Sequence, residues 1–335
     1  MIKIAINGFG RIGRAAFKIA LAHEGIEVVA INDLGDIQNL AYLLKFDSVY
    51  GRYGQEVKVE GGNLVISGKS IKVCQEKDPA KLPWGELGVD VVLESTGVFT
   101  EKEKASAHIT AGAKHVIITG PTKSEDVPTV VLGVNDKDLA GAQIVSNASC
   151  TTNCAAPMMA VLHNVFGVEK AILTTAHAYT ATQSIVDGPG GKGDFRRGRA
   201  AGINIVPSAT GAAVAATRTI PELKGKFDGV SLRVPVPVVS ISDITALLKR
   251  NVTVEEINTA FQEAATNPVY QGVLAVTEEE AVSTDFIGDP HSVTLDLSMT
   301  RVVDGNLIKI MGWYDNEWGY SNRLIEQVQE LMGGK

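Results

Sequence analysis

Cysteine is scarce in this chain, and an apolar run long enough to cross a membrane is missing. Only three cysteines occur among 335 residues, an odd number that argues against a disulfide framework and for a reducing compartment. No uninterrupted apolar stretch reaches the roughly 18 residues that would span a bilayer. The first residues read as a buried strand rather than a cleavable signal. We therefore expect a cytoplasmic protein with no membrane partner.

Positive charge is also in short supply, since the formal net charge is -7 and the pI about 5.5. Such a chain has no general surplus of lysine and arginine to neutralise a phosphate backbone, so we do not expect nucleic acid as its main partner. No repeat, low-complexity segment or flexible linker interrupts the sequence, and no metal site is expected. With 45% hydrophobic residues over 335 positions, the chain has enough apolar material for two domains.

The first half of the chain alternates short apolar runs with helical patterns, which predicts a parallel sheet built from β-α-β units. We expect strands at residues 2–7, 26–32, 89–93 and 115–118, and helices at residues 11–23 and 37–46. A further helix would be opened by a capping box from Thr100 to Glu103. Between residues 56 and 73, short strands separated by glycine turns indicate a hairpin insertion. The predicted fold class is α/β, a Rossmann-type doubly wound sheet.

Past residue 150 the strands become longer and follow one another, which predicts an α+β domain with a mostly antiparallel mixed sheet. These strands are expected at residues 168–175, 229–237, 239–248 and 293–313. Asp304-Gly305 would form a tight turn, and Thr253 with Glu256 would cap a helix. Apolar residues at helical spacing near the C-terminus predict a helix that packs on the first domain. The expected domains are residues 1–149 plus 316–335, and residues 150–315.

The turn after the first strand carries a dinucleotide-binding pattern, Gly8-Phe9-Gly10-Arg11-Ile12-Gly13. The pattern follows a strand, opens a helix, and is followed 20 residues later by Asp33, as the fingerprint requires. Glycines there allow a pyrophosphate to approach the free amides of the helix N-terminus. Asp33 can accept hydrogen bonds from a ribose and would repel a 2′-phosphate, so the predicted cofactor is NAD. The competing interpretation is a glycine turn that only closes the β-α-β unit.

Two later strands end in segments that could also contact the cofactor, because ligands of such sheets bind beyond the carboxyl ends of the strands. These segments contain Thr96 and Thr119. An ordinary loop explains either threonine about as well.

Cys150 is predicted at the N-terminus of a helix, where free amides and the helix dipole would lower the pKa of its thiol. Pro157 lies beyond the first turn, so this helix either kinks or is preceded by a separate short piece. Cys154 is one turn further on, where a disulfide with Cys150 would be strained. We interpret Cys154 as a packing residue, and Cys74 as part of the core.

Residues 146–154 resemble the active-site segment of the glyceraldehyde-3-phosphate dehydrogenase family, and residues 6–14 are similar to that family's N-terminus. The likeness continues through residues 174–177, 197–201, 208–213, 233–235 and 313–317, so it covers essentially the whole chain. The resemblance implies that Cys150 is the nucleophile and His177 the base that activates it. Taken alone, a histidine at position 177 would more often be a core or surface residue.

The implied reaction is oxidation of an aldehyde held on Cys150 as a thiohemiacetal, followed by transfer of the resulting thioester to inorganic phosphate. It requires two anion sites. The resemblance assigns the substrate's phosphate to Thr180, Thr182 and Arg233, and the attacking phosphate to Ser149, Thr151, Arg197, Thr210 and Gly211. Any one of these arginines could instead form an ion pair within a loop. The implied partners are glyceraldehyde 3-phosphate and inorganic phosphate.

The resemblance also supplies cofactor contacts and an oligomeric state. Asn316 would orient the nicotinamide amide with Tyr320 close by, and Lys77 lies where many relatives carry an arginine near the adenine. Thr182 likewise stands where many bacterial relatives have an aspartate. Residues 180–201 are similar to a loop that meets a neighbouring subunit, which implies a homotetramer.

Two alternatives remain open at this point. An erythrose-4-phosphate dehydrogenase of the same superfamily would resolve the thioester with water instead of phosphate, but the complete set of attacking-phosphate residues favours phosphorolysis. A non-catalytic thiol sensor with the same fold is the second alternative, although no position needed for the chemistry is missing.

Overall fold

The computed structural model describes residues 1–333, and the chain divides into two compact units. The first contains Met1–Val130, Lys137–Ala148 and Ser321–Lys335, and the second contains Val131–Asp136 and Ser149–Tyr320. Within residues 1–333, none of the helices combines the length and the apolar character that crossing a membrane would take.

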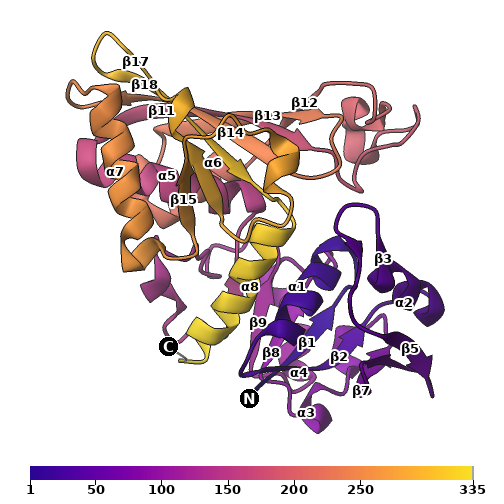
Figure 1. The fold of residues 1–335 in the computed structure, drawn as a ribbon. Coiled ribbons are helices and arrows are strands. Elements are labelled where there is room, and N and C mark those ends of the chain that lie inside the picture. Colours follow the sequence, from indigo (N-terminus) through magenta and orange to yellow (C-terminus); the bar gives the residue numbers. More distant parts are fainter. Residues whose placement is uncertain (334–335) are drawn as a thin grey trace. The chain divides into compact units, whose positions relative to one another are not determined.

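The first unit is built on an eight-stranded sheet in the order β10-β9-β8-β1-β2-β7-β6-β5 (Figure 1). The pairs from β10 through β7 are parallel, whereas β5 and β6 form the predicted hairpin and extend the sheet beyond β7 in antiparallel fashion. The strands are β1 Ile2–Asn7, β2 Ile26–Asn32, β5 Val57–Glu60, β6 Asn63–Ile66, β7 Lys69–Cys74, β8 Val91–Glu94, β9 His115–Ile118 and β10 Ile144–Ser146. The predicted doubly wound α/β sheet is confirmed.

Helices accompany the strands of this unit, and all of them except the short α3 lie where the sequence predicted a helix. They are α1 Arg11–Ala22, α2 Ile37–Lys45, the short α3 Trp84–Leu87 and α4 Lys102–Thr110, and a two-stranded ribbon of β3 Phe46–Asp47 and β4 Gly51–Arg52 follows α2. The last helix, α8 Trp318–Leu331, returns the chain to this unit from Ser321 onward. Its Leu324, Ile325 and Val328 are fully buried.

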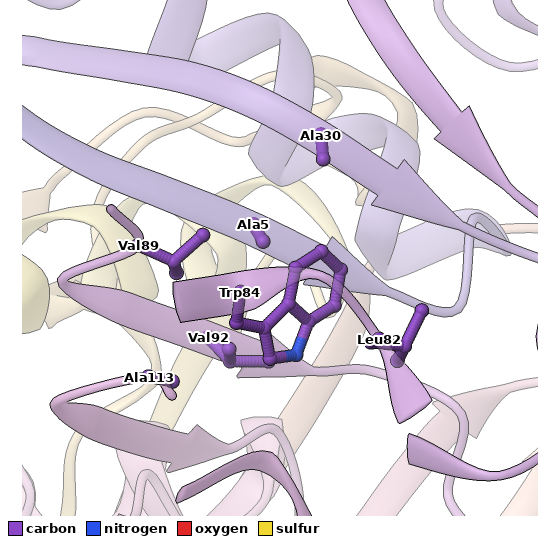
Figure 2. Packing of buried hydrophobic residues seen from close by; sticks show 7 residues of the cluster. All are labelled: Ala5, Ala30, Leu82, Trp84, Val89, Val92 and Ala113. Atoms are coloured by element: carbon purple, nitrogen blue, oxygen red, sulfur yellow. The ribbon is translucent and has the colours of Figure 1, made fainter. Parts of the chain in front are cut away.

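One apolar cluster of the first unit surrounds Trp84, whose ring is completely buried. Figure 2 shows the indole among side chains of β1, β2 and β8 and of the connecting segments that contain Leu82, Val89 and Ala113. The cluster consists of Ala5, Ala30, Leu82, Trp84, Val89, Val92 and Ala113. Small alanines on the strands leave room for the large ring, as close packing requires.

The predicted capping box from Thr100 to Glu103 is wrong. Helix α4 begins at Lys102, and its N-cap residue Glu101 makes no side-chain capping hydrogen bond. Instead the amide of Lys102 donates to the hydroxyl of Ser124, at 3.0 Å. A long-range partner thus satisfies the helix N-terminus, and a local sequence pattern cannot report such a partner.

The second unit contains an eight-stranded mixed sheet in which β12-β13-β11-β14-β18-β16-β15 are consecutive and β17 pairs with β18. Most pairs are antiparallel, with parallel pairing of β11 with β13 and of β15 with β16. The strands are β11 Val168–Ala178, β12 Val206–Ala209, β13 Phe227–Val234, β14 Ser240–Leu248, β15 Leu274–Thr277, β16 Val293–Asp296, β17 Arg301–Val303 and β18 Leu307–Tyr314. Its helices are α5 Cys150–Phe166, α6 Ala212–Thr219 and α7 Val254–Thr266. The predicted α+β character is confirmed.

Two local predictions for this unit are confirmed and one is refined. Thr253 and Glu256 form the expected capping box of α7. Asp304 and Gly305 both adopt positive φ, at 49° and 80°, and they connect β17 to β18 as the tight hairpin turn that this pair favours. The long strand expected over residues 293–313 is in fact three strands, because the chain turns between β16 and β17 as well.

Candidate active site

The glycine turn of the first unit has no room for side chains at two of its positions. Gly8 has a φ of +94°, and a Cβ there would lie 2.7 Å from the backbone of Ser95 and Thr96. A Cβ on Gly13 would lie 2.1 Å from the carbonyl oxygen of Gly8. Around Gly10 nothing lies within 4 Å of such a position, so this side of the turn is open. The turn is therefore packed tightly against β8 and α1 and leaves its free face for a ligand.

That face lines a cavity of about 630 Å³ at the carboxyl ends of β1, β2 and β8. Of the residues predicted to contact the cofactor, Gly8, Gly10, Asp33, Lys77 and Thr96 line it. The sequence analysis did not single out the remaining lining residues, which are Asn7, Asn32, Leu34, Glu76, Ser95, Val98 and Phe99. These residues could have been found from their position in the sequence, because each lies at the end of a parallel strand or in the segment that follows it. The cavity's size and its polar groups fit part of a dinucleotide.

Asp33 ties the end of β2 to the glycine turn. Its two carboxylate oxygens accept hydrogen bonds from the amides of Phe9, at 2.7 Å, and Gly35, at 2.8 Å. Each carboxylate oxygen has a second lone pair, so the group can still accept a hydroxyl from a ligand.

The other predicted cofactor residues of this unit do not line the cavity. The guanidinium of Arg11 forms an ion pair with Asp47 at 2.8 Å, and Ile12 and Gly13 continue into helix α1. The amide and the hydroxyl of Thr119 both donate to the carbonyl of Glu94, at 3.0 and 2.9 Å.

In the second unit, Cys150 is the first residue of α5, as predicted. The hydroxyl of Ser149 caps this helix by accepting the amide of Thr152, at 3.1 Å. The hydroxyl of Thr152 in turn donates to the carbonyl of Ala212 at the start of α6, at 3.2 Å. The helix runs without interruption through Pro157, so no separate piece precedes it.

His177, near the end of β11, brings its Nε2 to 3.4 Å from the Sγ of Cys150. Its Nδ1 has two neighbours, the carbonyl oxygen of Ala178 at 2.7 Å and the Nη1 of Arg233 at 2.6 Å. The two contacts require different forms of the ring. A protonated Nδ1 can donate to the carbonyl, whereas an unprotonated Nδ1 can accept from the guanidinium, which can only donate. Arg233 also donates to the same carbonyl, at 3.1 Å.

The charges of this pair are subject to opposing effects. Although Cys150 keeps some exposure, burial raises the pKa of its thiol, while Arg233 and the amide of Thr151 lower it. Burial and the nearby Arg233 lower the pKa of His177 to about 3. The sequence predicted only the lowering of the thiol pKa and missed the larger effect of burial. Burial penalises each charge taken singly, but a proton that passes from Sγ to Nε2 creates a pair of opposite charges that stabilise each other.

The other cysteine of this helix provides a comparison. Cys154 is fully buried, its sulfur lies 3.9 Å from that of Met158, and burial raises its pKa to about 12. At pH 7.5 we expect iodoacetamide to alkylate Cys150 at least about 100-fold faster than Cys154, because Cys150 is partly exposed and has His177 beside it to take its proton, whereas Cys154 is buried. Peptide mass spectrometry over a time course measures both rates in one sample. Equal rates would contradict the activation of Cys150.

Apart from Arg233, which lies beside His177, the groups predicted to bind phosphates fall into two places in the second unit. The hydroxyls of Thr180 and Thr182 lie 2.9 Å apart, and Arg197 donates to Thr182 at 3.2 Å while pairing with Asp194 at 3.1 Å. Thr182 was assigned to the substrate's phosphate and Arg197 to the attacking phosphate. Their hydrogen bond therefore joins one residue of each predicted anion site.

The second place is formed by the N-termini of α5 and α6. Ser149 caps α5, Gly211 is the N-cap residue of α6, and the hydroxyl of Thr210 accepts the amide of Ala212 at 3.2 Å. Thr151 is different, because its hydroxyl lies 2.9 Å from the buried hydroxyl of Tyr314. Two adjoining helix N-termini present free amides that favour an anion.

The remaining predicted residues of this unit are buried. The side-chain oxygen of Asn316 accepts a hydrogen bond from Ser240 at 3.0 Å. Tyr320 is 4% exposed, and burial raises the pKa of its hydroxyl. Among residues 1–333 there is no group of three histidine, cysteine or acidic side chains that could hold a metal.

A glycine turn whose cavity fits part of a dinucleotide, and a cysteine–histidine pair, define the class of this protein, an oxidoreductase that uses a nicotinamide cofactor. Residues 2–102 match the family model described as glyceraldehyde 3-phosphate dehydrogenase, NAD binding domain, and residues 149–316 match the C-terminal domain of the same enzyme. The chain belongs to the glyceraldehyde-3-phosphate dehydrogenase family, and its cofactor is NAD.

Individual relatives agree over nearly their whole length. The chain is 52% identical to the glyceraldehyde-3-phosphate dehydrogenase of Clostridium pasteurianum over 333 residues, which cover 98% of each chain. It is 53% identical to that of Streptomyces coelicolor over 329 residues, or 97% of each chain. With the enzyme of Geobacillus stearothermophilus it shares 52% identity over 327 residues, 97% of this chain and 96% of the relative. The predicted resemblance to the bacterial family is thereby confirmed.

Proposed function

We propose that this protein oxidises and phosphorylates glyceraldehyde 3-phosphate to 1,3-bisphosphoglycerate, with the substrate carried on Cys150. The observation that supports this most strongly is the 3.4 Å contact between the Sγ of Cys150 and the Nε2 of His177. A nucleophile within reach of a base is the arrangement that covalent catalysis needs. The sulfur adds to the aldehyde carbon while the thiol proton passes to Nε2 and from there to the aldehyde oxygen, which becomes the hydroxyl of the thiohemiacetal and leaves Nε2 free again.

The two steps that follow use the same pair. His177 takes the hydroxyl proton of the thiohemiacetal while the hydride leaves, so that a thioester remains on Cys150. NAD, when bound, accepts that hydride. Inorganic phosphate then attacks the acyl carbon, and the bond to sulfur breaks to release the acyl phosphate and the thiolate. Ser149, Thr151, Arg197, Thr210 and Gly211 are proposed to hold that phosphate.

Arg233 is proposed to bind the substrate's own phosphate together with Thr180 and Thr182. Because Arg233 also contacts His177, binding of the substrate would change the surroundings of the base. Only the tautomer with its proton on Nδ1 leaves Nε2 free to accept the thiol proton. Arg233, at 2.6 Å from Nδ1, favours the opposite tautomer. A phosphate that draws the guanidinium away leaves Nδ1 to donate to the carbonyl of Ala178, which prepares Nε2 as the base.

Substitution of Arg233 by glutamine tests this function. We expect kcat/KM for glyceraldehyde 3-phosphate to fall by about 100-fold or more, because charged hydrogen bonds to the phosphate are lost. For unphosphorylated glyceraldehyde we expect no loss, because the competing donor beside Nδ1 is gone. Arg250→Gln, at an exposed ion pair with Glu256, is the matched control. An equal loss on both aldehydes would contradict the proposed role of Arg233.

For the cofactor, we propose that Asp33 binds a ribose hydroxyl with the lone pairs left free by Phe9 and Gly35. Asn316 and Tyr320 are proposed to contact the nicotinamide. Further contacts are proposed for Gly8, Gly10, Arg11, Ile12, Gly13, Lys77, Thr96 and Thr119. Residues 1–149 with 316–335 would form the NAD-binding domain, and residues 150–315 the catalytic domain.

We also propose a cytoplasmic homotetramer. The loop over residues 180–205 exposes several large apolar side chains, among them Ile185 at 88%, Phe195 at 83% and Ile203 at 83%. Exposure of this kind on one segment marks a surface that a partner covers, and a second copy of the chain is the proposed partner. All three cysteines are free, as expected in a reducing compartment. Sedimentation equilibrium should give four times the 35.5 kDa of one chain; a monomer mass would contradict the assembly.

A further inference from the structure

A carboxylate lies completely buried beneath the cofactor cavity of the first unit. It belongs to Glu94, the last residue of β8, and its neighbour is His108 of α4. Neither side chain has any exposed surface, and the Nε2 of His108 lies 3.0 Å from the Oε2 of Glu94. The proposed chemistry does not use either group.

The hydrogen bonds around this pair define its protonation. The indole nitrogen of Trp84 can only donate, and it lies 3.1 Å from the Nδ1 of His108. Nδ1 must therefore accept, which places the ring proton on Nε2 and leaves the imidazole neutral. His108 then donates to Glu94.

Glu94 is consequently surrounded by donors. Its Oε2 also accepts from the side-chain amide of Asn7, at 2.6 Å, and its Oε1 accepts from the amide of Thr96, at 2.8 Å, and from the Thr96 hydroxyl. The two amides and the Nε2–H of His108 have no acceptor to offer, so each of these three donors needs an oxygen lone pair of Glu94. The partners named here for Glu94 include no lysine or arginine.

The same network reaches the wall of the cofactor cavity. The side-chain oxygen of Asn7 accepts from Asn32 at 2.7 Å. Asn32 in turn binds Glu76 twice, donating to its carbonyl and accepting from its amide, both at 2.9 Å. Asn7, Asn32, Glu76 and Thr96 all line the cavity. One chain of hydrogen bonds thus runs from Trp84 to four lining residues.

We propose that Glu94, oriented by His108 and Trp84, is a positioning residue for NAD: its buried carboxylate holds Asn7 and Thr96 in the orientation that the dinucleotide requires. This inference rests on NAD occupying the cavity and is independent of the acyl-transfer chemistry. Burying a carboxyl group costs folding free energy that apolar side chains of similar size would not. What it provides in return is a fixed direction for every polar group around it.

Glu94→Gln tests the proposal with little change in shape. The NH₂ group of a glutamine would face either the Asn7 and His108 donors or the amide of Thr96. Two donors cannot hydrogen-bond to each other, so Asn7 or Thr96 must turn away. We expect the Kd for NAD, measured by calorimetry without aldehyde, to rise by about tenfold or more. Glu103→Gln, the same change at an exposed position of α4, should leave it unchanged. A Kd within twofold of the parent protein for Glu94→Gln would overturn the proposal.

A purely structural role predicts a different result. Lower stability alone does not change a Kd measured where the variant is fully folded, since binding is then to the native state. Trp84→Phe provides a second variant, because an aromatic ring remains in the cluster of Figure 2 while the indole donor is lost together with part of the buried ring volume. We expect its Kd for NAD to rise several-fold, with kcat at saturating NAD and the alkylation rate of Cys150 unchanged. An unchanged Kd in Trp84→Phe would overturn the proposal even if Glu94→Gln does not fold.

Discussion

Replacing Cys150 with serine should lower kcat for oxidation of glyceraldehyde 3-phosphate by about 10⁴-fold or more, with little effect on NAD affinity. A serine hydroxyl is much less acidic than a thiol and is a weaker nucleophile, and loss of a covalent nucleophile typically removes most of the catalytic rate. The cofactor cavity is lined only by residues of the first unit, so its NAD Kd should stay within about twofold. Steady-state NADH formation and calorimetry measure the two quantities.

The matched control is Cys154→Ser, the same change one turn further along α5. Its sulfur is buried against Met158 and the carbonyl of Gly312, so this variant should lose some stability and keep most of its kcat. If Cys150→Ser retained full activity, the covalent mechanism would be wrong. If the parent protein itself formed no NADH, the thiol-sensor interpretation would gain support.

Replacing His177 with asparagine should lower kcat by about 10²- to 10⁴-fold, which is the rate enhancement that a positioned general base usually contributes. It should also shift the alkylation of Cys150 to higher pH. The sign follows from the structure: burial raises the pKa of the thiol, and the asparagine that replaces His177 has no basic nitrogen to take up the thiol proton. A larger fraction of the thiol therefore stays protonated and unreactive at neutral pH.

Rates of iodoacetamide reaction between pH 6 and pH 9 measure this shift. His23→Asn, whose ring contacts only the carbonyl of Glu24 among the hydrogen bonds of the structure, serves as the control and should follow the parent profile. A His177→Asn profile that coincides with the parent's would show that the imidazole does not activate the thiol.

Features of the site that depend on local sequence could be predicted. Gly8 and Gly13 are required because a Cβ would meet backbone at less than 3 Å, and a strand-glycine-helix pattern reports this. Cys150 was placed at a helix N-terminus because its segment follows a strand and precedes an apolar run, and Ser149 does cap α5. Asp33 follows β2 at the spacing that the fingerprint gives.

Features that depend on distant contacts could not be predicted. Arg233 and His177 are 56 residues apart, and only the parallel pairing of β11 with β13 places them side by side. The burial that raises the pKa of Cys150 likewise comes from surrounding elements. The direction of the Thr151 hydroxyl toward Tyr314 and the failure of Thr100 to cap α4 have the same origin. The family resemblance supplied roles for these residues, whereas their geometry had to come from the fold.

The covalent account depends most on a thioester that only phosphate resolves at a useful rate. Mixing the protein with NAD and glyceraldehyde 3-phosphate in phosphate-free buffer measures this directly in a stopped-flow instrument. We predict a burst of NADH equal to the concentration of Cys150, followed by near arrest, and steady turnover as soon as inorganic phosphate is added. Sustained turnover without phosphate would contradict the account and point to hydrolysis of the thioester, as in an erythrose-4-phosphate dehydrogenase.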